Sequence, residues 1–111
     1  MTPEQRKEVF DRLDQEGREL LLVKGMDYAG NEDVLANFKR NALALGLTKY
    51  QVWAVYFGKH IDAILNAIKK NPQAPLTYSE GLASRVLDAR NYLGLFVCMV
   101  QEDNPKLGSL D

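Results

Sequence analysis

Three short capping motifs constrain the fold of this chain more than any other feature. In a Thr-x-x-Gln or Thr-x-x-Glu motif, the threonine hydroxyl accepts from an early helix amide while the later side chain reaches back. Each motif therefore predicts the start of a helix. The three motifs are Thr2 with Gln5, Thr48 with Gln51, and Thr77 with Glu80.

The rest of the pattern predicts one all-α domain, a four-helix bundle. A further helix start is expected at Asn31 or Asp33, with Gly46 as its C-terminal stop. Apolar spacing then predicts helices over 3–24, 33–45, 49–70 and 79–101, and no run alternates with the period of two that a strand requires. With 111 residues, the chain is expected to form a single domain over 1–101 and a loosely ordered tail over 102–111.

Composition excludes several classes of function. Fourteen Lys and Arg against fifteen Asp and Glu leave a net charge of −1, so the basic field of a nonspecific nucleic-acid binder is missing. The sequence has no CxxC or HExxH motif and no glycine-rich phosphate loop. The longest apolar run, 92–100, is about half of what a membrane span needs, and the N-terminus has no apolar signal core. A cytoplasmic protein with no membrane partner is expected.

Helical spacing assigns faces to the two long C-terminal helices. Over 49–70 the expected core face consists of Trp53, Phe57, Ile61, Ile64 and Ile68. Lys59, Asp62 and Asn66 lie nearly opposite, which is typical of a solvated face. Over 79–101 the first apolar stripe consists of Leu82, Val86, Ala89, Leu93, Phe96 and Val100.

A second stripe on the last helix combines polar and apolar residues. It begins with Asp88 and Asn91 and continues into Leu95 and Met99, so we expect it to be covered by another helix or by another subunit. A carboxylate on a covered face costs several kcal/mol unless a partner compensates it. That partner is either Arg85, three residues earlier, or a ligand amine or magnesium ion.

Two further places are candidates for a site. The segment 24–31 is expected to be a loop that groups Lys24, Asp27 and Tyr28 before a helix N-terminus, where backbone amides favour an anion. Its alternative interpretation is a glycine-rich turn with Tyr28 packed on the core. His60, at the edge of the core stripe, is either a site residue or a hydrogen-bonded packing residue.

Three segments together resemble a group of small phage and prophage proteins in the nucleotide modification associated domain family. The segments are KGMDYAGNEDVLANFKRNA, VYFGKHIDAIL and RVLDARNYLGLF, within roughly residues 20 to 100. That family is similar to the all-α NTP pyrophosphatases of MazG type. The residues that carry the resemblance are Lys24, Asp27, Tyr28, Asn37, Phe38, Lys59, His60, Asp88, Asn91 and Tyr92.

The resemblance implies a nucleotide site with an incomplete metal centre. MazG-type enzymes hold magnesium against a triphosphate with several carboxylates, whereas this chain has only Asp62 and Asp88, with Asn91 where the last carboxylate would be. Binding of a nucleotide or another phosphate-bearing molecule without turnover, with no cofactor or with Mg²⁺, is therefore expected. The expected ligand-binding residues are Lys24, Asp27, Tyr28, Asn37, Lys59, His60, Arg85, Asp88 and Asn91.

Two alternatives stay open. One is a magnesium-dependent NTP pyrophosphohydrolase that holds its metal with Asp62 and Asp88. The other is a non-enzymatic protein-binding or inhibitory module that docks through Leu95 and Met99. A homodimer is expected in each case, and a phage-encoded chain would act in the host cytoplasm.

Overall fold

The fold is all-α. A computed structural model describes residues 1–28, 33–76 and 81–106, without the side chains of 25–28. It contains four helices, α1 (Pro3–Tyr28), α2 (Ala36–Leu45), α3 (Lys49–Lys70) and α4 (Leu82–Asp103), and the described residues form no strand. None of these helices is long and apolar enough to cross a membrane.

Two of the three capping motifs are confirmed in atomic detail. At the start of α1 the Gln5 amide donates to Thr2 Oγ1 at 3.1 Å, while Thr2 N donates to Gln5 Oε1 at 2.8 Å. The same reciprocal pair joins Thr48 and Gln51 at the start of α3. These bonds satisfy amides that a helix start leaves without intrahelical partners. The third motif, Thr77 with Glu80, lies outside the described residues.

Other helix boundaries differ from the expected ones. The loop expected from residue 25 is wrong, because α1 continues through Tyr28. α2 begins three residues late, at Ala36, because the Asp33 carboxylate accepts from the Leu35 amide at 2.9 Å and holds a turn ahead of the helix. Gly46 ends α2 at φ 67°, as expected of a left-handed stop. α4 starts at Leu82 and continues to Asp103, two residues into the expected tail.

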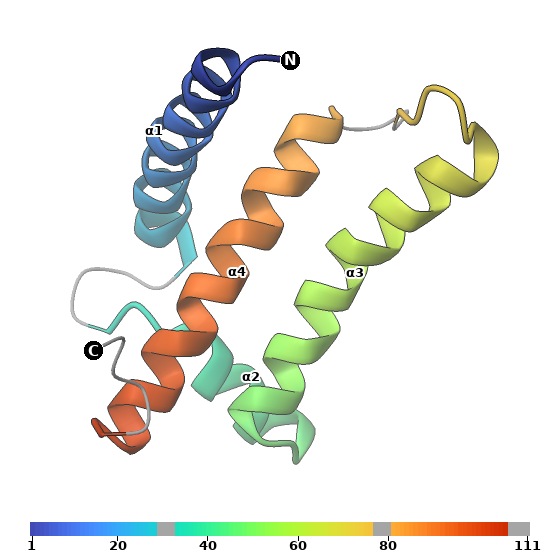
Figure 1. The fold of residues 1–111 in the computed structure, drawn as a ribbon. Coiled ribbons are helices and arrows are strands. Elements are labelled where there is room, and N and C mark those ends of the chain that lie inside the picture. The colour runs from blue at the N-terminus through green and yellow to red at the C-terminus, as the bar shows by residue number, and fades with distance from the viewer. Residues whose placement is uncertain (29–32, 77–80, 107–111) are drawn as a thin grey trace.

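Three long helices lie side by side and the short one closes an end. α4 is in the middle, with α1 packed on one flank and α3 on the other, while α2 packs on α3 near its N-terminus (Figure 1). α3 and α4 run antiparallel because the connection between them reverses the chain (Figure 1). Polar residues of α1 and α3 can therefore approach α4 from opposite flanks.

The core lies where α2 meets α3 and α4. Met99 has no exposed surface, and aromatic rings surround the cluster, with Phe38 edge-on to Tyr92 at 6.1 Å between centroids. Trp53 Nε1 donates to the Tyr92 carbonyl at 2.6 Å, which ties α3 to α4. The buried members of the cluster are Leu35, Phe38, Ala42, Val52 and Met99.

The expected core face of α3 is wrong, because the buried face lies part of a helical turn away from it. The buried residues of α3 are Val52, His60 and Ala67, whereas Ile68 on the expected stripe is exposed. The side of α3 that faces α2 and the Asp88 side of α4 therefore forms the core, and the more continuous apolar stripe is only partly covered. Periodicity located an apolar face correctly but did not show which neighbour would cover it.

The second stripe of α4 is covered by other helices of the same chain, which is one of the two expected alternatives. Asp88 and Met99 are buried, and Leu95 packs against the core cluster. The expectation that Leu95 and Met99 form a docking seam for another protein is therefore wrong. Leu93 and Phe96 of the first stripe are the apolar residues left exposed.

A network of charges joins the start of α3 to the end of α4. Lys39 bridges Asp33 and Glu102 at 2.8 Å each, and Lys49 bonds Asp103 at 2.7 Å. The Tyr50 hydroxyl lies 2.5 Å from the same Asp103 carboxylate. Hydrogen bonds from Lys39 and Lys49 lower the pKa values of Asp33 and Asp103, respectively.

This network predicts acid sensitivity. A carboxyl whose pKa is lower in the folded state stabilises the fold above its unfolded pKa, and that stability disappears as pH falls through the folded value. We expect the Asp103→Asn variant to lose less melting temperature than the wild type between about pH 6 and about pH 2.5. Circular dichroism melts measure this difference. Asp62→Asn, at an exposed position of α3, is the matched control, and an identical pH slope in the Asp103 and Asp62 variants would contradict the prediction.

Candidate functional site

A buried carboxylate lies where α1, α3 and α4 meet. Asp88 on α4 is only 3% exposed. Its Oδ1 accepts from Lys24 Nζ of α1 at 2.7 Å, and its Oδ2 lies 3.7 Å from His60 Nδ1 of α3. Three of the expected ligand residues, from three helices far apart in sequence, are thus brought together.

The local sequence explains how each of these side chains reaches the centre. His60 is buried on the core side of α3 and stacks on Tyr92, with 5.3 Å between ring centroids. Tyr92 follows Asp88 by one turn of α4, so the imidazole is held between the ring and the carboxylate. Lys24 lies near the end of α1, and its side chain reaches Asp88 on α4.

Lys24 differs from its partner in exposure. Its side chain is 43% exposed, whereas the Asp88 side chain is 4% exposed. The carboxylate therefore fixes the ammonium group from the protein side, while the other side of the ammonium faces solvent. A lysine held in this way presents a positive charge without the rotamer freedom of an ordinary surface lysine.

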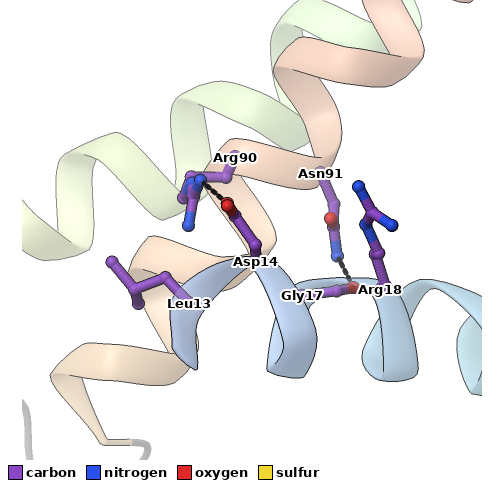
Figure 2. Close-up of a pocket in the computed structure, with 6 residues that line it drawn as sticks. All are labelled: Leu13, Asp14, Gly17, Arg18, Arg90 and Asn91. Carbon is purple, nitrogen blue, oxygen red and sulfur yellow. Dashed lines mark hydrogen bonds and ion pairs between the residues drawn. The ribbon is translucent and has the colours of Figure 1, made fainter. Parts of the chain in front are cut away.

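A groove lies beside this centre, between α1 and α4. Asn91 Nδ2 donates to the Gly17 carbonyl at 3.0 Å, and an Arg90 guanidinium nitrogen is hydrogen-bonded to Asp14 (Figure 2). Arg18 projects from α1 next to Asn91 (Figure 2). A cavity of about 160 Å³ is lined by Leu13, Asp14, Gly17, Arg18, Arg90 and Asn91.

Gly17 lies where α1 contacts α4. It is buried in the middle of α1, and a Cβ added to it would lie 3.5 Å from Asn91 Oδ1 and 3.8 Å from Leu87. An alanine there would make ordinary van der Waals contacts with both neighbours.

The other expected site residues lie on different parts of the helices. Asn37 lies on α2, where its Oδ1 accepts from Arg40 and Asn41 at 3.3 Å each. Lys59 is exposed on α3 and forms no ion pair with any described residue. Arg85 is half-buried one turn before Asp88 on α4. Asp27 and Tyr28 belong to the last turn of α1, and their side chains lie outside the described residues.

A magnesium centre built on Asp62 and Asp88 does not fit these positions. Asp62 is exposed on α3, whereas Asp88 is buried and bonded to Lys24. Within 1–24, 33–76 and 81–106, no three His, Cys, Asp or Glu side chains are grouped as a metal ion requires. The two carboxylates therefore do not form one metal site in this structure.

Sequence reasoning missed the arginines of the groove. Arg18 and Arg90 were not among the expected ligand residues, although Arg90 is next to Asn91, which was. Arg90 precedes Asn91, and Arg18 follows the mid-helix Gly17. Comparison of the chain with protein-family models, curated proteins and solved structures found no match in any of the three.

Proposed function

We propose that this chain binds a nucleotide, or another small molecule that carries phosphate groups, along the groove between α1 and α4. The supporting observation is the pair of arginines that line one cavity between these helices, with Lys24 further along α1. Lys24 is anchored to Asp88, and Arg18 and Arg90 line the cavity next to Asn91. Guanidinium groups match phosphate oxygens in a two-pronged geometry, and an ammonium adds a point charge.

Asp88 acts in this proposal as a positioning residue. It is too buried to contact a large ligand directly, but it holds the Lys24 ammonium, whose side chain is partly exposed near the end of α1. Asp14 has a comparable role for Arg90 through their hydrogen bond. Each carboxylate also compensates the charge of its own cation when no ligand is present.

A thermal-shift screen tests the proposal. We expect at least one member of a panel of mono-, di-, tri- and cyclic nucleotides, with and without magnesium, to raise the melting temperature by about 5 °C or more near saturation. Binding that is selective for the folded state must have this effect. A panel that leaves the melting temperature unchanged would exclude nucleotide binding.

A pair of arginine variants locates the site. Arg18→Met should abolish most of the nucleotide-dependent shift while leaving the ligand-free melting temperature nearly unchanged, because Arg18 is exposed. Arg12→Met is the matched control, since Arg12 is exposed on the same helix but does not line the cavity. Equal shifts in the two variants would place the ligand elsewhere.

The hydrolase alternative is less well supported. It needs a carboxylate cluster, and Asp62 and Asp88 are not arranged as one. Release of pyrophosphate from nucleoside triphosphates in the presence of magnesium, retained in wild type and lost in Asp62→Asn, would nevertheless favour it over simple binding.

A further inference from the structure

The polar side chains of the cavity between α1 and α4 lie in two pairs, one at each end (Figure 2). At one end, an Arg90 guanidinium nitrogen is hydrogen-bonded to the Asp14 carboxylate. At the other end, Arg18 projects beside Asn91, and Gly17 lies between the two pairs (Figure 2). Both ends offer hydrogen-bonding groups to a ligand, but the two ends differ in charge.

The Arg18 end carries an uncompensated positive charge. Arg18 is exposed on α1, and among the described residues none forms an ion pair or a hydrogen bond with its side chain. Its neighbour in the cavity, Asn91, is neutral. A guanidinium has five N–H donors in a planar arrangement that matches two phosphate oxygens at once. This end therefore suits one phosphate group.

The Asp14 end is neutral overall and accepts hydrogen bonds. The Arg90 guanidinium balances the charge of the Asp14 carboxylate, whose side chain is 53% exposed. A carboxylate has about four acceptor positions on its two oxygens, so a bond from Arg90 leaves positions for a ligand. A second phosphate would meet a negative charge here, whereas hydroxyl groups would donate to it.

The Asn91 amide has a fixed orientation. Its Nδ2 donates to the Gly17 carbonyl at 3.0 Å, and a carbonyl can only accept, so the amide oxygen and nitrogen cannot be exchanged. Asn91 Oδ1 is therefore left as an acceptor. The cavity thus combines one uncompensated cation with two acceptors, which favours a ligand that has one anionic group and several hydroxyl donors.

The cavity is too small to enclose a whole nucleotide. Its volume is about 160 Å³, whereas pockets that enclose drug-sized ligands measure about 300–1,000 Å³. Asp14 and Arg18 lie one turn apart on α1, which separates them by about 6 Å along the helix axis at about 1.5 Å per residue. A pentose ring that carries one phosphate can span a separation of this order.

We infer that the cavity binds the pentose phosphate portion of the ligand, with the phosphate at Arg18 and the sugar hydroxyls at Asp14 and Asn91. This inference rests on the proposed function, since a phosphate-bearing ligand must enter the groove. The base then lies outside the cavity, so different bases are tolerated. A single phosphate is sufficient, because Arg18 is the uncompensated arginine of the two that line the cavity.

Calorimetric titration of the full chain tests the inference. Ribose 5-phosphate, AMP and UMP should have dissociation constants within about tenfold of one another, because a base outside the cavity adds little. Adenosine, which lacks the phosphate, should bind about a hundredfold more weakly than AMP, since two charged hydrogen bonds are lost. ATP should bind no more tightly than AMP.

The titrations separate this inference from the proposed function. Binding of ATP without binding of AMP or ribose 5-phosphate would overturn the inference and leave the nucleotide site in place. Binding of AMP without binding of UMP or ribose 5-phosphate would also overturn it, because the base would then be recognised. If neither these probes nor any member of the nucleotide panel binds, the proposed function fails together with the inference.

A comparison of AMP with 2′,3′-dideoxy-AMP tests the sugar contacts. Loss of the two hydroxyls should weaken binding to the wild type by about tenfold. In Asp14→Ala this difference should largely disappear, because the charged acceptor is gone. Asp11→Ala is the matched control and should keep the difference, since Asp11 is exposed on the same helix and does not line the cavity. An undiminished difference in Asp14→Ala, with both variants folded by circular dichroism, would overturn the placement of the sugar.

Discussion

Replacing Met99 by alanine should lower the free energy of unfolding by about 3 kcal/mol, within the range of about 2–5 kcal/mol for buried large-to-alanine changes. Met99 has no exposed surface and lies in the cluster that joins α2, α3 and α4. Its truncation removes buried apolar area and leaves a cavity that the surrounding aromatic rings cannot fill without moving. Urea titration followed by circular dichroism measures the loss.

The adjacent position supplies the control. Cys98 is exposed on the same helix, so Cys98→Ala should change the free energy of unfolding by less than about 0.5 kcal/mol. If Met99 instead belonged to an interface between chains, Met99→Ala would change the mass of the protein and leave the stability of the monomer almost unaltered. That result would contradict the burial of Met99 between α2, α3 and α4.

Replacing Lys24 by methionine should destabilise the fold by about 2 kcal/mol. The change keeps most of the side-chain volume but removes the ammonium that compensates the buried Asp88 carboxylate. Breaking a fully buried pair typically costs about 3–5 kcal/mol. A smaller loss is expected here because the Lys24 side chain is 43% exposed, so solvent already weakens the pair.

A double variant identifies the cause of that loss. Adding Asp88→Asn to Lys24→Met removes the uncompensated charge, so the double variant should be more stable than Lys24→Met alone, by about 1 kcal/mol or more. The four free energies of unfolding form a double-mutant cycle. A double variant whose loss is the sum of the two single losses would mean that Lys24 and Asp88 do not interact, and the proposed role of Asp88 in the binding groove would then fail as well.

Local sequence determined several of the helix boundaries. The reciprocal bonds of Thr2 with Gln5 and of Thr48 with Gln51, and the left-handed Gly46, depend on neighbours within a few residues. Such features can be predicted because their partners are close in the chain. The extension of α1 through residue 28 shows the limit of this reasoning, since Gly25 does not end that helix.

The covered state of Asp88 was also predictable, but its partners were not. The continuation of its stripe into Leu95 and Met99 indicated a buried face, and Asp88 is buried. Arg85 was the partner considered for Asp88 because it lies three residues earlier on the same helix. Lys24 and His60, which the structure places at Asp88, come from positions 64 and 28 residues earlier in the chain.

Periodicity therefore determined that this chain is an all-α protein, which faces of its helices are apolar, and that a carboxylate on α4 would be hidden. Only the tertiary structure decided that the mixed polar stripe of α4 is covered by its own chain, while the more regular apolar stripe remains partly exposed to solvent. It also decided that Arg18 and Arg90 share a groove. The physical reason is that a helix determines its own faces through spacing along the chain, whereas the choice of neighbour for each face depends on packing between segments that are far apart in sequence.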